Sequence, residues 1–281
     1  MAWREVQAWR LTRPVPPRTI ETTMWRFWTL AAAAVLWVMP SLPGQAAAQP
    51  ARPAITVFAA ADLAFAFKEV VPLFEQRSGV RVTLVLGSSG LLARQIEHGA
   101  PADVFFSADR ALVDDLARAG AIIPETQSLY AQGRIVLAVS KRAGVALREL
   151  GDLLRPEVRR LAIANPDHAP YGRAAKEALQ ALGLWERLRP RLVYGENIRH
   201  TLQLVQAGAV EAAIVALSVA SVPEVDVVLI DPRLHGPLDQ MAAVVRRSGR
   251  PELGLAFLQL VQGAEGRPIM KRYGFLVPGE F

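Results

Sequence analysis

The alternation of short apolar runs with amphipathic segments, from residue 55 onward, most constrains the fold of this chain. The run AAIVAL at 212–217, for example, is apolar at every position. Such strands are typical of sheets buried on both faces, with helices between the strands in sequence covering those faces. The predicted strands are Ile55–Ala59, Val80–Leu86, Asp103–Ser107, Ile135–Val139, Arg160–Ala164, Leu192–Tyr194, Ala212–Ala216, Val225–Leu229 and Met241–Arg246. The pattern therefore predicts an α/β protein.

Two stretches are candidate boundaries within this alternating region. They are the polar turn Tyr130–Arg134 and the segment HGPLDQ at 235–240. A chain that leaves a first lobe, builds a second and returns to complete the first forms a hinged clamp. We therefore expect lobe 1 to comprise residues 49–133 plus 239–281, and lobe 2 to comprise residues 134–238.

The first 48 residues are typical of a targeting segment. Arg26 precedes an apolar core from Phe27 to Val38, and the small residues Ala46 to Ala48 end it. The core is too short for a comfortable membrane span. We expect a secretory signal peptide cleaved near Ala48 and a periplasmic protein. Residues 1–23, which precede this segment, are rich in Arg and Pro, as upstream untranslated sequence often is. We therefore expect either that the chain starts at Met24, or that it starts at Met1 and carries an upstream extension.

Charge and cysteine content narrow the functional class. The formal net charge of the 281 residues is +6, but residues 1–48 hold five Arg and two Glu, and their removal leaves 27 basic and 24 acidic residues. These charges are interspersed, without the basic clusters and interleaved aromatics of nucleic-acid-binding proteins. The chain contains no cysteine. Thiolate metal sites and disulfides are therefore excluded, and a packed core must stabilise the fold.

A glycine-serine turn follows one predicted strand and opens directly into a helix. In the sequence LVLGSSGLLARQIE, Gly87 to Gly90 connect the two elements. The first amides of a helix lack intrahelical acceptors and carry the positive end of its dipole, so this turn offers amides and hydroxyls to a small oxyanion. Two further helix starts follow strands, at Asp62, which is predicted as an N-cap, and at Tyr171 and Gly172. In α/β sheets such termini can converge on one ligand.

Five blocks of the chain together resemble the periplasmic molybdate-binding proteins of ABC transporters. In chain order they are ITVFAAADL, GSSGLLARQIEHGAPADVFFSAD, ANPDHAPYGRAAKEALQALGLW, GENIR and KRYGF. The similarity covers essentially the whole chain after the signal segment. It implies a type II periplasmic binding fold, in which two α/β lobes, each a mixed, mostly parallel sheet flanked by helices, are joined by two crossings.

The resemblance also implies a set of ligand-binding residues. Ser89 stands at the position of a hydroxyl ligand, and Tyr171 and Ile198 stand at positions whose backbone amides meet the anion. The remaining candidates are Ala61, Asp62 and Ser88. Asp62 occupies the place of a ligand serine in the best-known members, so its side chain is predicted to cap the helix while an amide at Ala61 or Asp62 faces the ligand. Ser88 is either a ligand or a helix cap.

Ala216 marks a second departure, because some members carry a tyrosine hydroxyl there. The departures at Asp62 and Ala216 each remove a hydroxyl ligand of the family. They leave the number of contacts to the ligand open, but they do not change the predicted class of ligand. The site is predicted to hold the molybdate oxyanion without direct metal-ion ligands.

The predicted function is the capture of molybdate or tungstate in the cleft between lobes and its delivery to a membrane permease and ATPase. Binding of sulfate or another tetrahedral oxyanion is the alternative. An enzyme is not expected: GSSG lacks the spacing of a nucleophile elbow, the four histidines lie in unrelated segments, and zincin, P-loop and dinucleotide motifs are missing. A surface adhesin would show repeats or an anchor. We expect a monomer without a cofactor.

Overall fold

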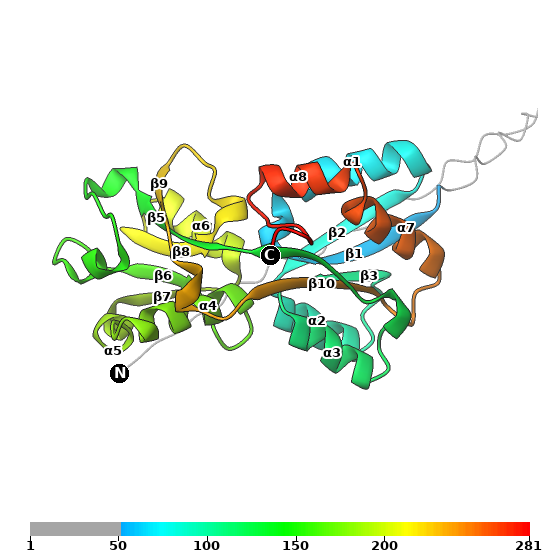
Figure 1. The fold of residues 1–281 in the computed structure, drawn as a ribbon, viewed down its shortest axis with the longest axis horizontal. Helices are drawn as coiled ribbons and strands as arrows, with labels where there is room; N and C mark the ends of the chain where they lie inside the picture. Colours follow the sequence, from blue (N-terminus) through cyan, green and yellow to red (C-terminus); the bar gives the residue numbers. More distant parts are fainter. Residues whose placement is uncertain (1–51) are drawn as a thin grey trace, which may run out of the picture. The chain divides into compact units, whose positions relative to one another are not determined.

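A computed structural model of the chain describes residues 52–281. The predicted signal segment, its cleavage site near Ala48 and both possible start codons lie outside the described residues. The described part contains two five-stranded sheets flanked by helices (Figure 1). Each sheet is mixed, with equal numbers of parallel and antiparallel strand pairs.

The first sheet has the strand order β2-β1-β3-β10-β4. Its strands are β1 (Ala54–Ala60), β2 (Arg81–Gly87), β3 (Val104–Ser107), β4 (Ser128–Gly133) and β10 (Leu238–Val244). The helices around it are α1 (Phe67–Ser78), α2 (Ser89–Glu97), α3 (Arg110–Arg118), α7 (Pro251–Gln262) and α8 (Gly266–Arg272). Helices α1, α7 and α8 cover one face, and α2 and α3 cover the other (Figure 1).

Aromatic side chains fill the core beneath α1 and α7. The rings of Phe67 and Phe106 meet edge to face with centroids 5.2 Å apart, and Phe257 packs edge to face on both. Edge-to-face contacts of this kind stabilise a core by about 0.5 to 1.5 kcal/mol each beyond the area they bury. The core therefore holds the strands and helices around this sheet without disulfides.

The second sheet has the strand order β7-β6-β8-β5-β9. Its strands are β5 (Ile135–Ser140), β6 (Leu161–Ala164), β7 (Leu192–Gly195), β8 (Ala212–Ala216) and β9 (Val225–Leu229). Its helices are α4 (Pro170–Ala181), α5 (Trp185–Leu188) and α6 (Ile198–Gln206). Both α4 and α6 pack on β6 and β8, whose side chains are entirely buried. This burial is the reason for the uninterrupted apolar runs in the sequence.

The chain passes between the sheets at two adjacent points. Strand β4 of the first sheet ends at Gly133, and β5 of the second begins at Ile135. The return runs into β10, where Leu238 pairs with Gly133 (Figure 1). The prediction of a polar turn at Tyr130–Arg134 is wrong, because Tyr130 and Ala131 are buried and the segment completes β4. The polar residues of this strand are tolerated because it lies at the edge of its sheet.

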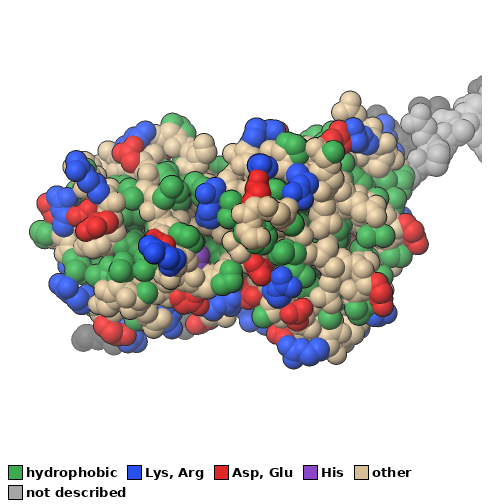
Figure 2. Space-filling model, in the orientation of Figure 1, with side chains coloured by type: hydrophobic (Ala, Val, Ile, Leu, Met, Phe, Trp, Pro, Cys, Tyr) green, Lys and Arg blue, Asp and Glu red, His purple; other side chains and the backbone are tan. Residues whose placement is uncertain are grey.

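Figure 2 shows one face of the molecule with Lys and Arg interspersed among Asp and Glu. The surface charges on this face therefore follow the mixed pattern expected from the sequence. Within residues 52–281, no helix combines the length and apolarity needed to cross a bilayer.

Candidate oxyanion-binding site

A small cavity lies where several strands of both sheets end and helices begin. Its free volume is about 10 Å³, near the smallest space that holds one water molecule and far below the roughly 300 to 1,000 Å³ of pockets that take drug-sized ligands. Its lining residues come from four strand-to-helix turns and from the end of β3. They are Ala60, Ala61, Asp62, Gly87, Ser88, Ser89, Ala108, Ala169, Pro170, Tyr171 and Ile198. All six residues predicted from the sequence are among them, so the convergence of helix starts, which the sequence left open, is present in the structure.

The glycine-serine turn places one hydroxyl at the cavity with a proton to donate. Gly87 ends β2, Ser88 is the N-cap residue of α2, and Ser89 is the first residue of that helix. Ser89 is buried, and its Oγ accepts a hydrogen bond from the Ala108 amide at 2.9 Å. A hydroxyl carries one donor and two acceptor sites, so the Ser89 proton remains free for a ligand oxygen.

Ser88 makes a contact with the opposite side of the cavity. Its Oγ lies 2.8 Å from Nδ1 of His168, which precedes α4. The Ser88 side chain does not cap α2. Burial lowers the pKa of His168, with Arg94 acting in the same direction, so the ring is neutral at pH 7. A neutral ring either accepts the Ser88 proton or donates to Ser88 Oγ, and the second tautomer frees that proton for the cavity.

The prediction that Asp62 is an N-cap is wrong. The N-cap position of the 3₁₀ turn η1 (Ala61–Ala64) belongs to Ala60, and Asp62 lies inside the turn. Its side chain is completely buried. Asp62 Oδ2 accepts hydrogen bonds from Tyr171 Oη at 2.8 Å and Gln240 Nε2 at 3.0 Å. Two donors distant in the sequence therefore hold Oδ2, while the amides of Asp62 and Leu63 lie near the carboxyl.

Tyr171 and Ile198 each lie in the first turn of a helix. Tyr171 follows Pro170 in α4, and Ile198 is the first residue of α6, whose N-cap Asn197 accepts from two amides. Proline at the first helical position is favoured because its missing amide has no intrahelical partner there. The amides of Tyr171 and Ile198 have no intrahelical acceptor, which is the property that the predicted backbone contacts require.

Two further residues extend the polar network behind the cavity, and the sequence reasoning missed both. Tyr130 Oη donates to Gln240 Oε1 at 2.8 Å, and Gln240 Nε2 lies 3.1 Å from Tyr171 Oη. Both side chains are buried. The available signal was Gln240, a polar residue immediately before the apolar run MAAVV. Burial raises the pKa of Tyr130 and Tyr171 well above the ordinary value, so both hydroxyls keep their protons and act as donors.

Contacts across the cavity bring the two sheets and their helices together. The Gly90 amide donates to the His168 carbonyl at 3.0 Å, and Ser218 Oγ donates to the Asp62 carbonyl at 2.9 Å. Arg173 of α4 also pairs with Asp109, the N-cap residue of α3, at 2.5 Å. Ala216, at the end of β8, is buried and is not among the residues lining the cavity. The tyrosine hydroxyl beside the cavity comes instead from α4.

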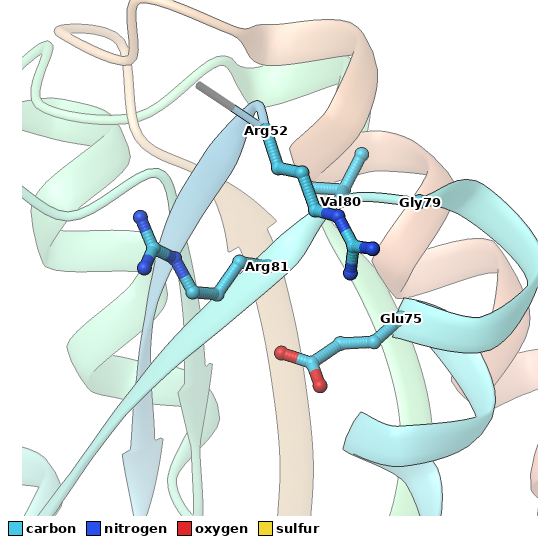
Figure 3. A pocket seen from close by; sticks show the side chains of 5 residues that line it. All are labelled: Arg52, Glu75, Gly79, Val80 and Arg81. Atoms are coloured by element: carbon cyan, nitrogen blue, oxygen red, sulfur yellow. The ribbon is translucent and has the colours of Figure 1, made fainter. Parts of the chain in front are cut away.

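A larger pocket lies at the other end of the first sheet. It is lined by Arg52, Glu75, Gly79, Val80 and Arg81 (Figure 3). Ala54 pairs with Arg81 where the parallel strands β1 and β2 begin, so this pocket is at their amino ends. Ligands of α/β sheets gather at the carboxyl ends, where the small cavity lies. Residues 52–281 contain no cluster of three or more His, Asp or Glu side chains able to bind a metal ion.

Comparison with known proteins decides the family. The model of the bacterial extracellular solute-binding proteins matches residues 55–276. The chain belongs to this family. The molybdate-binding protein ModA of Escherichia coli is 37% identical over 232 residues, covering 79% of this chain and 89% of the relative. ModA of Rhodobacter capsulatus is 32% identical over 210 residues, covering 74% of this chain and 82% of the relative. The resemblance to molybdate-binding proteins is confirmed.

Solved structures of solute-binding proteins confirm the fold class. The periplasmic molybdate-binding protein of Azotobacter vinelandii has a TM-score of 0.75 at 27% identity, covering 80% of this chain and 99% of that structure. The sulfate-binding protein SubI of Mycobacterium tuberculosis has a TM-score of 0.70 at 18% identity, covering 81% and 88%. At this identity, the second likeness concerns the fold alone.

Proposed function

We propose that this solute-binding protein captures molybdate or tungstate in the small cavity and delivers it to the permease and ATPase of an ABC transporter. The observation that carries the proposal is the convergence of four strand-to-helix turns, one of which contributes the Ser89 hydroxyl, at one small cavity. The identity to two molybdate-binding proteins over most of both chains supports the choice of ligand.

The proposed ligand contacts are those predicted from the sequence. Ser89 donates its hydroxyl proton, and amides at Ala61 or Asp62, Tyr171 and Ile198 donate from the starts of η1, α4 and α6. No Lys or Arg is among the described residues lining the cavity. Hydroxyl and amide donors suit a fully ionised oxyanion, because a proton on the ligand would face another donor.

Capture is proposed to proceed by closure of two lobes without chemical conversion of the ligand. The lobes are residues 49–133 plus 239–281 and residues 134–238, with the hinge at the paired residues Gly133 and Leu238. A closed form is favoured by the ligand because only there do donors from both lobes reach it. The closed protein would then dock on the permease. We further propose export by the amino-terminal signal segment, a periplasmic location and a monomeric state.

Isothermal titration calorimetry of the purified protein with molybdate, tungstate, sulfate and phosphate tests this function. We expect molybdate and tungstate to bind more tightly than sulfate. Molybdate at a thousand times its Kd should stabilise the fold by about 4 kcal/mol, measured as an increase in Tm. Stabilisation by sulfate without any response to molybdate would show instead that the site belongs to the sulfate alternative.

A further inference from the structure

The two oxygens of the Asp62 carboxyl have different surroundings. Oδ2 accepts two hydrogen bonds, from Tyr171 Oη and from Gln240 Nε2. The Gln240 amide is oriented by Tyr130, which donates to its Oε1. Since both neighbours of Oδ2 are donors, a proton on this carboxyl has to reside on Oδ1.

Asp62 Oδ1 is buried and has no hydrogen-bond partner within the described part of the chain. The residue itself lines the cavity. A buried oxygen without a partner is unfavourable in either state, whether it is an unpaired charge or a hydroxyl without an acceptor. A ligand oxygen would accept from a protonated Oδ1, whereas an ionised Oδ1 would repel a dianion.

We propose that Asp62 is a ligand-binding residue, and that the tetrahedral dianion is taken up together with one proton that Oδ1 donates in a hydrogen bond to an anion oxygen. The inference rests on the proposed function and deepens it. The proton comes from solvent and remains on the carboxyl, so the complex carries one negative charge less than the ionised site with its dianion. A serine hydroxyl at this position would be a donor at every pH, whereas Asp62 is a donor only when protonated.

The surroundings of Asp62 favour the protonated form. Burial raises the pKa of its carboxyl to about 6, and the hydrogen bonds from Tyr171 and Gln240 and the nearby amides of Asp62 and Leu63 offset this only in part. A bound dianion would raise the pKa further.

The elements packed around η1 bring few charges toward the carboxyl. Strand β4 contributes Tyr130 and α4 contributes Tyr171, both of which keep their protons. Lys68 of α1 and Arg199 of α6 lie over the ring of Phe65, with their charged groups 5.1 and 5.6 Å from its centroid. Within residues 52–281, no Lys, Arg or His side chain forms a hydrogen bond or an ion pair with the Asp62 carboxyl.

The remaining neighbours of η1 are uncharged at the contact. Helix α6 also contributes Ile198 to the cavity, and η6 (Leu217–Val219) contributes Ser218, which donates to the Asp62 carbonyl. On the α2 side, Ser88 contacts a neutral His168. The charge state of the carboxyl is therefore set by burial and by the ligand.

Calorimetry of the wild-type protein with molybdate tests the proton uptake directly. At pH 7, titrations in two buffers of different ionisation enthalpy should give close to one proton taken up per anion bound. The affinity should fall about tenfold between pH 7 and pH 8, because each complex requires a proton that the free carboxyl has lost.

The matched variant is Asp62→Asn, which has nearly the same shape. Its amide oxygen can accept from Tyr171 and Gln240, while its NH₂ group donates to the anion at every pH. We expect Asp62→Asn to bind molybdate without proton uptake, with a pH-independent affinity that exceeds the wild-type value at pH 8. Asp226→Asn, on exposed β9, is the control and should keep the wild-type proton uptake.

Four outcomes would overturn the inference. Molybdate binding by the wild type without proton uptake overturns it and leaves the proposed function standing. Absence of molybdate binding from pH 5 to pH 8 overturns both. A folded Asp62→Asn protein, as judged by its melting curve, that no longer binds molybdate excludes a donor at this position. Tighter binding of phosphate than of molybdate at pH 7.5, without proton uptake, would assign the proton to the ligand and exclude solvent as its source.

Discussion

Tyr171 Oη donates a hydrogen bond to Asp62 Oδ2 across 2.8 Å, and this bond joins α4, which packs on the second sheet, to the turn that follows β1 of the first. The two residues are 109 positions apart in the sequence. Both residues line the same cavity. The packing of α4 against the turn after β1 therefore affects the hydrogen bonding of the Asp62 carboxyl inside that cavity.

Tyr171→Phe should weaken molybdate binding by about 1 to 3 kcal/mol, because the buried network that positions the Asp62 carboxyl at the cavity loses one of its members. Calorimetric titration at pH 6 measures the change. Tyr194→Phe, on a half-exposed side chain of β7, is the matched control and should leave the affinity unchanged. Unchanged binding by Tyr171→Phe would restrict the contribution of Tyr171 to its backbone amide.

Ser89→Ala should weaken molybdate binding by about 1 to 3 kcal/mol through the loss of a hydroxyl donor to a charged ligand. The variant also removes the acceptor of the Ala108 amide, so a modest loss of stability accompanies it. Ser78→Ala is the control, because Ser78 bonds to the backbone at the end of α1. It should alter stability without altering affinity. Equal affinities of the two variants would remove Ser89 from the site.

Gly133→Ala should weaken binding at least tenfold. A Cβ at this position would lie 2.1 Å from Tyr171 Oη and 2.9 Å from Gln240 Nε2, so the buried network would have to move. Gly249→Ala is the control, because a Cβ there meets no atom within 4 Å. The double variant Gly133→Ala/Tyr171→Phe removes the closest clashing atom but leaves the Cβ 2.9 Å from Gln240 Nε2, so its loss of affinity should be smaller than the sum of the two single losses. Additive losses would contradict this steric account.

Asp62 should give the unliganded protein a distinctive pH dependence of stability. Its pKa is raised from 3.8 to about 6, so the folded state binds more protons than the unfolded state between these values. The slope of the unfolding free energy with pH is then negative, and stability is lost as pH rises through this window. Asp62→Asn avoids this loss, so its free energy of unfolding should exceed that of the wild type by about 3 kcal/mol at pH 7. The difference should disappear below pH 4.

Denaturant unfolding of both proteins at pH 4, 5 and 7 measures this difference, because the other titrating groups are common to both. Asp231→Asn is a control of opposite sign. Hydrogen bonding to Arg233 lowers the pKa of Asp231 from 3.8 to about 2, so its contribution to stability should stay nearly constant from pH 7 to pH 4 and be lost only as the pH falls further toward 2. A constant difference between Asp62→Asn and wild type across this range would exclude the raised pKa.

Patterns local in the sequence predicted the α/β class and the separate helix starts, and the resemblance to molybdate-binding proteins assigned those starts to one site. Buried strands such as β8 are recognisable because each residue faces a helix, and the turn after β2 is recognisable because glycine and serine suit a helix start. Strand β4 could not be recognised in this way. Its polar residues resemble a turn, and it is a strand because β10 pairs with it and neighbouring side chains bury Tyr130.

The role of Asp62 was decided by the tertiary structure. Its local sequence equally suits a cap, and a cap would have kept the carboxylate on nearby amides and ionised. The residues that determine its state are Tyr171 and Gln240, 109 and 178 positions away. Local hydrogen bonding and hydrophobic periodicity are set within a few residues, whereas burial and its effect on charge depend on which distant segments pack together. For this reason the sequence by itself determined the α/β class and the residues of the helix starts that line the cavity, and only the packed chain determined the partners of the Asp62 carboxyl and its pKa.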